Sequence, residues 1–583
     1  MLGKRIDAVL LCSEFIAVIE IKTGFSPSSA VRQVEDYAIG LSCFHEESRG
    51  RRIVPIAVTG GSAGTSPGKF DAELSIETTR CASFGTLASL LCSILEESPA
   101  AMHESVNQLA WDEARFRPVP TIVDAAVALY SEKDIFEIGH ACASRETLGL
   151  ATSAIEDIVI HSRDARVRSV VFVTGVPGAG KTLVGLNAVH SPHLRNEGAF
   201  LSGNGPLVKI LREALIRDAT KRKNGEQRLS RRNAETKVNA FIHNVHRFAA
   251  EYYKQEGRTP AQHIIVFDEA QRAWNAKMNE RKFQRELSEP SMLLDVMDRH
   301  ADWAVIVALI GGGQEINSGE AGLREWGVAL SSRRHWSVYA SPDVITGADS
   351  TAHAKLVDDR SELSEIHELG DLHLKVSVRS IRARDISAWV NAVVSGDATS
   401  AAKICVEMEA KPKLTRNLSA AREWLSVQSR GSTRAGLVGS AHAARLRVDG
   451  LEPSFAFHRD FDWENWFLDT ADDVRSSSTL EVFATQFEIQ GLELDWVGVC
   501  WGDDFVWDGS KWKYTRFANT HWKPEKNEEK KLYKRNAYRV LLTRARQGMV
   551  IYVPQAEPCD ITRLGKELDA TAQFLIHAGA EVL

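Results

Sequence analysis

An apolar run in the middle of the chain passes directly into a glycine-rich loop, and this junction limits what the chain can fold into. Residues 170–174 read VVFVT, residues 175–182 read GVPGAGKT, and an apolar segment follows over residues 183–189. In a strand–loop–helix of this kind, glycines let successive backbone N–H groups turn inward to form an anion nest. The N-terminus of the helix adds partial positive charge. The pattern therefore predicts a doubly wound α/β domain that binds phosphate groups.

Each position of this loop has an expected task in holding a nucleotide. Lys181 should reach the β and γ phosphates of ATP, and the hydroxyl of Thr182 should bind Mg²⁺. The backbone should surround the phosphates at four further positions, Gly175, Pro177, Gly178 and Gly180. ATP and Mg²⁺ are therefore the predicted cofactors.

Two later apolar runs end in residues suited to nucleotide hydrolysis. Residues 263–267 (HIIVF) lead into Asp268 and Glu269, at the end of a predicted strand where ligands of parallel sheets bind. Asp268 suits the water shell of Mg²⁺, and Glu269 suits activation of the water that attacks the γ-phosphate. Residues 303–310 lead into a GGGQE segment, in which Gln314 would sense the γ-phosphate. A flexible turn is the alternative for that segment.

Two arginine-containing segments lie farther along the chain. Residues 374–380 (LKVSVRS) and 538–546 (YRVLLTRAR) resemble segments of superfamily 1 helicases that place arginines on the γ-phosphate. The resemblance implies that Arg379 and Arg544 are paired arginine fingers, because a cationic fork stabilises charge on the transferring phosphoryl group. A second domain that supplies such arginines distinguishes a helicase from other P-loop ATPases.

A third segment between these two resembles the coupling motif of the same superfamily. It covers residues 485–495 (TQFEIQGLELD). The resemblance implies that Glu493 binds the ribose and that Gln490 and Gly491 lie near the nucleic-acid strand. Any one such segment could instead be a polar surface helix or turn, but their order along the chain favours a helicase.

The amino-acid sequences of the motifs are similar to those of one branch of these helicases, the Schlafen group 3-like DNA/RNA helicase domain family. The matching segments read TGVPGAGKTLVGL (174–186), FLSGNGPLV (200–208), FDEAQRAW (267–274), GGGQEI (311–316) and YRVLLTRAR (538–546). The resemblance covers about residues 115 to 555. It implies two RecA-like lobes acting on nucleic acid, with Ser202, Gly203 and Asn204 at the motif that touches the strand. No upstream glutamine motif for adenine is found, which leaves the choice of nucleotide base open.

The first residues of the chain predict a β-hairpin with opposed carboxylates. Apolar strands over residues 5–11 and 16–22 flank a four-residue loop. If Leu11 pairs with Ile16, Asp7 lies opposite Glu20, and Lys22 lies on the same face. Two facing carboxylates repel each other unless a cation lies between them. Asp7 and Glu20 therefore suit an Mg²⁺ or Mn²⁺ ion, and Lys22 suits the attacking water or the developing charge; a solvated hairpin face is the alternative.

This hairpin, followed by a helix with Gln33 and Tyr37, resembles the PD-(D/E)xK nuclease superfamily. The signature reads Asp7 with Glu20-Ile21-Lys22. The resemblance implies a metal-dependent nuclease of restriction-endonuclease-like fold. That fold normally has a helix and a strand before the aspartate. Two alternatives are therefore open: the start codon is misassigned, or the domain is truncated, in which case an inactive form is among the expectations.

The length of 583 residues exceeds one hydrophobic core and predicts several domains. The predicted fold is α/β: two RecA-like P-loop domains with parallel sheets, preceded by the small nuclease-like domain. The expected boundaries are residues 1–115 for the nuclease-like domain, 116–165 for a helical connector, 166–350 for the first RecA-like domain and 351–583 for the second. The prolines at positions 118 and 120 mark the first boundary.

Composition excludes several classes of protein. The longest apolar runs are too short to span a bilayer, and no secretory leader begins the chain, so a cytoplasmic protein without membrane contact is expected. The eight cysteines show no C-x-x-C pair and no metal-ligand spacing. The net charge of −6 argues against a globally basic coat. Tryptophans 501, 507, 512 and 522 alternate with cations and could stack bases, although a packed hairpin is the favoured interpretation.

The sequence as a whole predicts an ATP-dependent helicase or translocase fused to a metal-dependent nuclease-like domain. By analogy, its role would be nucleic-acid processing or antiviral defence against foreign DNA. The expected partner is DNA or RNA, single-stranded in the motor channel, and a second copy of the chain or a defence-system protein is compatible with the pattern. The alternative is a nucleotide-gated nucleic-acid-binding switch with an inactive nuclease fold.

Overall fold

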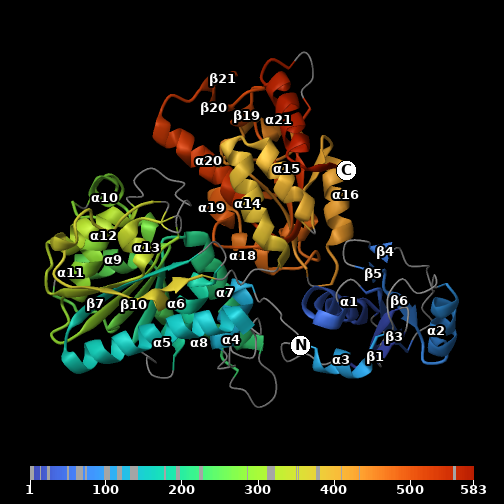
Figure 1. Ribbon diagram of the computed structural model, residues 1–583, viewed down its shortest axis with the longest axis horizontal. Coiled ribbons are helices and arrows are strands. Elements are labelled where there is room, and N and C mark those ends of the chain that lie inside the picture. The colour runs from blue at the N-terminus through green and yellow to red at the C-terminus, as the bar shows by residue number, and fades with distance from the viewer. Residues whose placement is uncertain are drawn as a thin grey trace. The chain divides into compact units, whose positions relative to one another are not determined.

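The computed structural model describes most of the chain. The described residues are 6–12, 15–22, 27–48, 51–60, 70–71, 75–97, 106–114, 121–130, 142–175, 179–191, 197–221, 228–255, 257–284, 286–311, 322–348, 351, 353–375, 381–408, 410–431, 433–555 and 560–583. They form two compact units, of which the smaller contains the described residues up to 114 together with Glu423–Ala435. The larger unit contains the others and has two α/β lobes (Figure 1).

The smaller unit is built on a mixed sheet in the order β1-β2-β3-β5-β4, with β6 also on β3. Strand β2 pairs antiparallel with β1 and parallel with β3, so it is covered on both edges. Successive side chains from Ile16 through Glu20 are buried, so both faces of the strand are covered, which accounts for its nearly continuous apolar sequence. The elements are β1 (Ala8–Leu11), β2 (Ile16–Lys22), α1 (Pro27–Phe44), β3 (Ile53–Thr59), β4 (Phe70–Asp71), β5 (Ile76–Glu77), β6 (Arg80–Ala82), α2 (Leu87–Glu96) and α3 (Gln108–Glu113).

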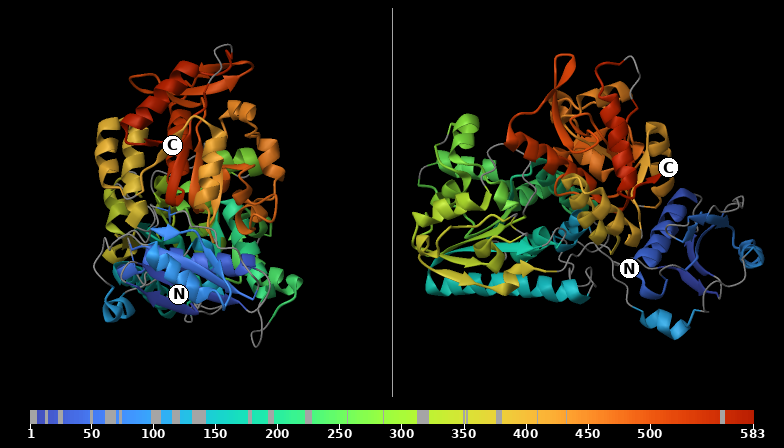
Figure 2. Two further views of the ribbon diagram at one scale, coloured as in Figure 1. Left: turned by 90° about the vertical axis from the view of Figure 1, so that its right-hand side faces the viewer. Right: turned by 45° about the horizontal axis from the view of Figure 1, so that its top comes forward.

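The first lobe of the larger unit has a parallel sheet in the order β13-β12-β7-β11-β10-β8-β9. Alternate residues of β7 face opposite sides: Val171 and Val173 enter one core, and Val170 and Phe172 enter the other. Both faces are therefore covered by helices, as Figures 1 and 2 show. The elements up to the third strand are α4 (Ile122–Tyr130), α5 (Cys142–Ala165), β7 (Arg168–Gly175), α6 (Lys181–His190), β8 (Gly198–Ser202), α7 (Gly205–Lys221), α8 (Arg231–Phe241) and β9 (Ile242–Asn244).

The remaining elements of this lobe carry the sheet beyond the boundary expected at residue 350. They are α9 (Val245–Lys254), β10 (Ile264–Asp268), α10 (Ala276–Phe283), α11 (Glu289–Met297), β11 (Ala304–Leu309), α12 (Gly322–Ser331), β12 (Trp336–Ala340), α13 (Pro342–Thr346), β13 (Ile366–Glu368) and β14 (His373–Leu374). Strand β13 pairs with β12, and β14 pairs with β7. At the other end, Ala151 and Ile155 of α5 enter the same core as Val171. The segment expected as a connector thus supplies helices to the first lobe.

The second lobe has a six-stranded sheet in the order β17-β16-β18-β22-β15-β23. Its described pairings are parallel, and an antiparallel sheet of β19, β20 and β21 accompanies it. The elements are α14 (Ile381–Ser395), α15 (Ala398–Glu407), β15 (Lys413–Thr415), α16 (Leu418–Gln428), β16 (Ala435–Gly439), α17 (Phe455–Asp460), α18 (Trp463–Leu468), β17 (Phe483–Thr485), α19 (Gln486–Ile489), β18 (Leu494–Cys500), β19 (Phe505–Trp507), β20 (Trp512–Ala518), β21 (His521–Pro524), α20 (Glu528–Leu542), β22 (Ala545–Tyr552), α21 (Gly565–His577) and β23 (Glu581–Val582). Two lobes with parallel sheets are consistent with two RecA-like domains.

Tryptophans of the second lobe pack into its core. Trp501 and Trp512 are buried, and their rings lie 5.7 Å apart. The indole N–H of Trp522 donates to the carbonyl of Thr562 at 3.0 Å. For Trp501 and Trp512 the packed interpretation is therefore confirmed. Among the described residues, no helix combines the length and the apolar character that a membrane span requires.

Candidate nucleotide-binding site

The glycine-rich loop lies at the carboxyl end of β7, an interior strand of the sheet of the first lobe. A Cβ atom on Gly175 would come within 2.6 Å of the Leu374 Cβ in β14, so only glycine fits there. Gly180 has a φ of +84° and precedes the first residue of α6. Gly175 thus allows β14 to pack closely, and Gly180 adopts the left-handed backbone conformation that precedes α6. Pro177 and Gly178 lie outside the described residues.

The predicted phosphate and Mg²⁺ residues come together at this end of the sheet. The ammonium of Lys181 donates to the carbonyl of Gly175 at 2.9 Å. The Thr182 hydroxyl donates to the carboxylate of Asp268, which ends β10, at 3.1 Å. Burial, and then the charge of Glu269, raises the pKa of Asp268 to about 7. A hydroxyl and a buried carboxylate within hydrogen-bond distance offer the oxygen ligands that Mg²⁺ prefers, so these residues fit that ion.

Glu269 stands in a strained turn that several hydrogen bonds hold in place. Its φ is +55°, which is uncommon for a residue other than glycine. The side-chain amide of Gln271 donates to the Glu269 carboxylate and accepts the backbone N–H of Gly311 at 2.9 Å. The indole N–H of Trp326 donates to the carbonyl of Ala270 at 3.0 Å. Gln271 lies within the motif FDEAQRAW, and no role was predicted for it from the sequence, although its position two residues after Glu269 was a usable signal.

The second lobe holds the guanidinium of Arg544 among its own backbone carbonyls. Arg544 is buried, and it donates to the carbonyls of Val540 at 2.9 Å and Leu492 at 3.3 Å. It also donates to the hydroxyl of Thr543 at 3.0 Å. Because α20 ends at Leu542, these bonds satisfy a carbonyl of its last turn. The other two predicted γ-phosphate residues, Gln314 and Arg379, lie outside the described residues.

The residues predicted to touch the nucleic-acid strand contact each other across the two lobes. Asn204 follows Gly203 in the first lobe, and its side chain donates to the carbonyl of Gln490 in the second. The side chains of Asn204 and Gln490 are buried, and so is that of Ser202. Gly491 has a φ of +78°, which a side chain would not tolerate easily. The structure thus brings the two predicted motifs together, in a conformation that covers their side chains; Glu493, two residues on, is half-buried.

The hairpin of the smaller unit has the register that the sequence predicted. Leu11 pairs with Ile16, and the same register continues toward Asp7 and Glu20. The Asp7 carboxylate accepts the backbone N–H of Ile21 at 2.8 Å. One carboxylate oxygen of Glu20 lies 2.8 Å from the ammonium of Lys22. The other, Oε2, is buried and has no hydrogen-bond partner among the described residues.

The charges of Asp7 and Glu20 act on the third predicted residue of this hairpin, Lys22. The hydrogen bond to Glu20 and the negative charges nearby, including that of Asp7, raise the pKa of Lys22. The ammonium is therefore held in its charged form. On the following helix α1, the amide of Gln33 donates to the hydroxyl of Tyr37 at 2.7 Å.

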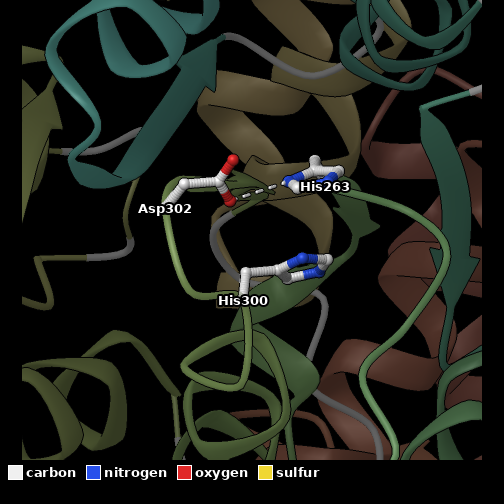
Figure 3. Close-up of side chains that lie close together, drawn as sticks. All are labelled: His263, His300 and Asp302. Atoms are coloured by element: carbon white, nitrogen blue, oxygen red, sulfur yellow. Dashed lines mark ion pairs between the residues drawn. The ribbon is translucent and has the colours of Figure 1, made fainter.

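Figure 3 shows a separate cluster of His263, His300 and Asp302, whose potential ligand atoms lie within 4.8 Å of one another. It precedes β10 and β11, at the opposite end of the sheet from the glycine-rich loop. One ring nitrogen of each histidine already contacts a backbone carbonyl, at 3.0 and 3.1 Å. Burial, and then the charge of His263, lowers the pKa of His300 to about 4, and Arg168 adds to this effect. These contacts connect the starts of two strands, and the positive charge of Arg168 disfavours a further cation.

Known proteins that resemble this chain include several helicases, although no curated protein matches it. Among solved structures, the helicase domain of Hef from Pyrococcus furiosus is 11% identical, with a TM-score of 0.25, over 68% of this chain and 94% of that one. The DUF1998 helicase MrfA bound to DNA is also 11% identical, with a TM-score of 0.27, over 80% of this chain and 52% of that one. The family model described as "Schlafen group 3, DNA/RNA helicase domain" matches residues 168–555, more than half of the chain. The chain therefore belongs to the Schlafen group 3 DNA/RNA helicase domain family.

Proposed function

We propose that this protein uses ATP hydrolysis in its first lobe to move along a strand of DNA or RNA. The observation that carries the proposal is the contact of the Thr182 hydroxyl with the buried Asp268 carboxylate, beside Lys181. A desolvated carboxylate with a raised pKa next to a hydroxyl and an ammonium is a site prepared for a divalent cation and a phosphate. Family membership supports nucleic acid as the partner.

Residues of both lobes have proposed roles in the cycle. Lys181 binds the β and γ phosphates, Thr182 and Asp268 hold Mg²⁺, and Glu269 orients the attacking water. Arg379, Arg544 and Gln314 would act on the γ-phosphate, and Glu493 on the ribose. For Arg544 this requires the guanidinium to leave the carbonyls of Val540 and Leu492, so we propose that lobe closure moves it.

The proposed strand contacts also change during the cycle. Ser202, Gly203 and Asn204 in the first lobe and Gln490 and Gly491 in the second would face the strand. The bond from Asn204 to the Gln490 carbonyl closes these motifs against each other. A strand that competes for the same polar groups would open them, which links its binding to the relative position of the lobes.

ATP turnover with and without nucleic acid tests the motor. We expect single-stranded DNA or RNA to stimulate hydrolysis and Lys181→Ala to abolish it. Glu269→Gln should lower turnover roughly 100- to 10,000-fold with ATP binding retained, because a positioned base contributes about that much. Nucleic-acid binding that responds to ATP without turnover would support the nucleotide-gated switch instead.

A second activity is proposed for the smaller unit, because the buried Glu20 Oε2 has no hydrogen-bond partner in the described residues. A buried, unsatisfied carboxylate oxygen is costly, and a cation bound there would satisfy it. Asp7 and Glu20 would hold Mg²⁺ or Mn²⁺, which when bound supplies an activated water for phosphodiester cleavage. Lys22 would hold its proton and stabilise negative charge near that water.

Cleavage of labelled DNA and RNA in the presence of Mg²⁺ or Mn²⁺ tests this nuclease. Glu20→Gln and Lys22→Met should each abolish cleavage without affecting ATP turnover, and Lys181→Ala should leave cleavage intact. Combined with the motor, such an activity would suit defence against foreign nucleic acid. No cleavage of any strand by the wild-type protein would leave the smaller unit as an inactive nuclease fold.

A further inference from the structure

The segment between the two last motifs of the second lobe is strongly basic. Residues 511–537 contain nine lysines and arginines and three acidic residues, in a chain whose net charge is −6. They form β20, β21 and most of α20. Local positive charge of this density, in an otherwise acidic protein, is typical of a surface that binds phosphates.

Two of these cations lie opposite each other, and a bound anion would reduce the repulsion between them. Arg516 of β20 pairs directly with Lys523 of β21 in the antiparallel ladder, and both residues are exposed. Like charges directly opposite each other destabilise a sheet. In the described part of the chain, neither side chain forms an ion pair. The opposite face of the hairpin is packed, since the rings of Phe517 and Trp522 lie 5.1 Å apart and Trp522 bonds to Thr562.

The hairpin borders a cleft of about 380 Å³ at the carboxyl end of β16. Four cationic residues line it, Arg445, Arg447, Arg516 and Lys534. His442 also lines it, and burial lowers the pKa of its ring. Arg445 and Arg447 are already oriented by ion pairs with Asp560 and Glu452. The size falls in the range of about 300–1,000 Å³ that is usual for ligand pockets.

One lining residue of this cleft, Lys534, belongs to a buried network. The carboxylate of Asp504 accepts hydrogen bonds from the Ser440 hydroxyl at 2.7 Å and the Tyr538 hydroxyl at 2.8 Å. The ammonium of Lys534 lies 3.8 Å from the same carboxylate. Such a network holds Lys534 in one geometry before a ligand arrives.

An aromatic ring stands beside the cations. Phe455 lines the cleft and is 78% exposed, which is unusual for a large apolar side chain. Cations beside an exposed ring match single-stranded nucleic acid, whose phosphates need positive charge and whose bases stack on aromatic faces. An acidic peptide would use the cations and leave the ring unexplained.

We propose that this cleft binds a single-stranded nucleic acid, with Arg516 and Lys523 on its phosphates and Phe455 stacked on a base. The proposal rests on the proposed motor function and adds a contact surface on the second lobe outside the helicase motifs. The hairpin of β20 and β21 then binds the nucleic-acid strand beside α20, the helix that ends just before Arg544.

Binding of a dye-labelled oligothymidylate and an oligouridylate, measured by fluorescence anisotropy at several salt concentrations, tests the charges. The double variant Arg516→Gln/Lys523→Gln should weaken binding roughly tenfold near 0.15 M salt, because each single-strand phosphate contact contributes about 0.7 to the salt slope. The slope of log affinity against log salt should fall by about 1.4. The matched control, Lys277→Gln/Lys403→Gln, removes two exposed lysines elsewhere and should change neither value.

Stacking is tested with Phe455→Ala and Phe455→Tyr. Loss of the ring should weaken binding roughly 5- to 100-fold, and tyrosine should restore it. Unchanged affinity in the charge and ring variants, with normal strand-stimulated ATP turnover of the wild type, would overturn the cleft and leave the motor standing. Absence of both strand binding and stimulated turnover in the wild type would overturn both.

Discussion

The side chain of Gln271 joins Glu269 to Gly311 across two neighbouring strands. Its amide accepts the N–H of Gly311 at 2.9 Å and donates to the Glu269 carboxylate. Glu269 follows β10 and Gly311 follows β11, which pair in parallel. A displacement of Gly311 would therefore be passed on to the carboxylate proposed to orient water.

Gln271→Ala removes this connection. We expect ATP binding to persist and turnover to fall about 100-fold, since a displacement of order 1 Å in a positioned group can cost that much. Stimulation by nucleic acid should fall as well. Gln271→Glu, which places a second carboxylate beside Glu269, should be at least as damaging. Wild-type turnover in Gln271→Ala would show that Glu269 is positioned without it.

Arg544→Ala tests the proposed arginine finger against a purely structural role. A finger contributes about 1,000- to 100,000-fold to turnover, whereas the loss of a hydrogen bond to the Leu492 carbonyl costs about 1–3 kcal/mol of stability. We expect both effects, and turnover should be measured well below the unfolding temperature. Arg539→Ala, on the same helix, is the control, because Arg539 bonds to Asn391 and Asn536. Equal ATP turnover in the two variants would show that Arg544 has only a structural role, at the C-terminal end of α20.

Divalent ions should stabilise the smaller unit if Asp7 and Glu20 bind them. At ten times its dissociation constant, Mg²⁺ or Mn²⁺ would add about 1.4 kcal/mol to the free energy of unfolding. Amide hydrogen exchange in β1 and β2 should slow accordingly, and EDTA should reverse the change. Glu20→Gln should remove the response, and Glu47→Gln, at a more distant carboxylate, should keep it. Identical exchange with and without ions would argue against a metal site in the hairpin.

Lowering the pH should reduce the stability of the starts of β10 and β11, because of the lowered pKa of His300. Its pKa in the folded protein is about 4, below the usual value near 6.5 in an unfolded chain. The unfolded chain then binds a proton that the folded protein excludes, so stability is complete above about pH 6.5 and declines toward pH 4. The loss is roughly 2 kcal/mol by about pH 5. The groups facing the ring are His263, Asp302, Arg168 and the carbonyl of Gln262.

Hydrogen exchange of β10 and β11 near pH 7.5 and near pH 5, corrected for intrinsic exchange rates, measures this loss. His300→Gln should remove most of the pH dependence because glutamine does not titrate in this range. The same pH dependence in His300→Gln would assign the effect to other groups.

Local pattern was sufficient for much of this molecule. Two strand ends were predicted from the sequence, one at the run VVFVT with the glycines after it and one at the Asp-Glu pair. A contact between their residues followed, because the carboxyl ends of buried parallel strands bring the next residues to one edge of the sheet. Alternation along the N-terminal hairpin likewise gave the pairing of Leu11 with Ile16, since a slip of one residue would turn its apolar face outward. Strands β13 and β14 pair within the first lobe and lie beyond the boundary expected at residue 350, because strands of three and two residues carry too little periodicity to assign.

The sequence by itself determined the phosphate loop, the family and the order of the motifs, all of which depend on neighbouring residues. Only the tertiary structure decided which partners their side chains have: Arg544 on the carbonyls of Val540 and Leu492, and Asn204 on the carbonyl of Gln490. The reason is physical. A buried donor takes an acceptor that the fold brings near, and most of these acceptors lie far away along the chain, where sequence spacing carries no information about distance.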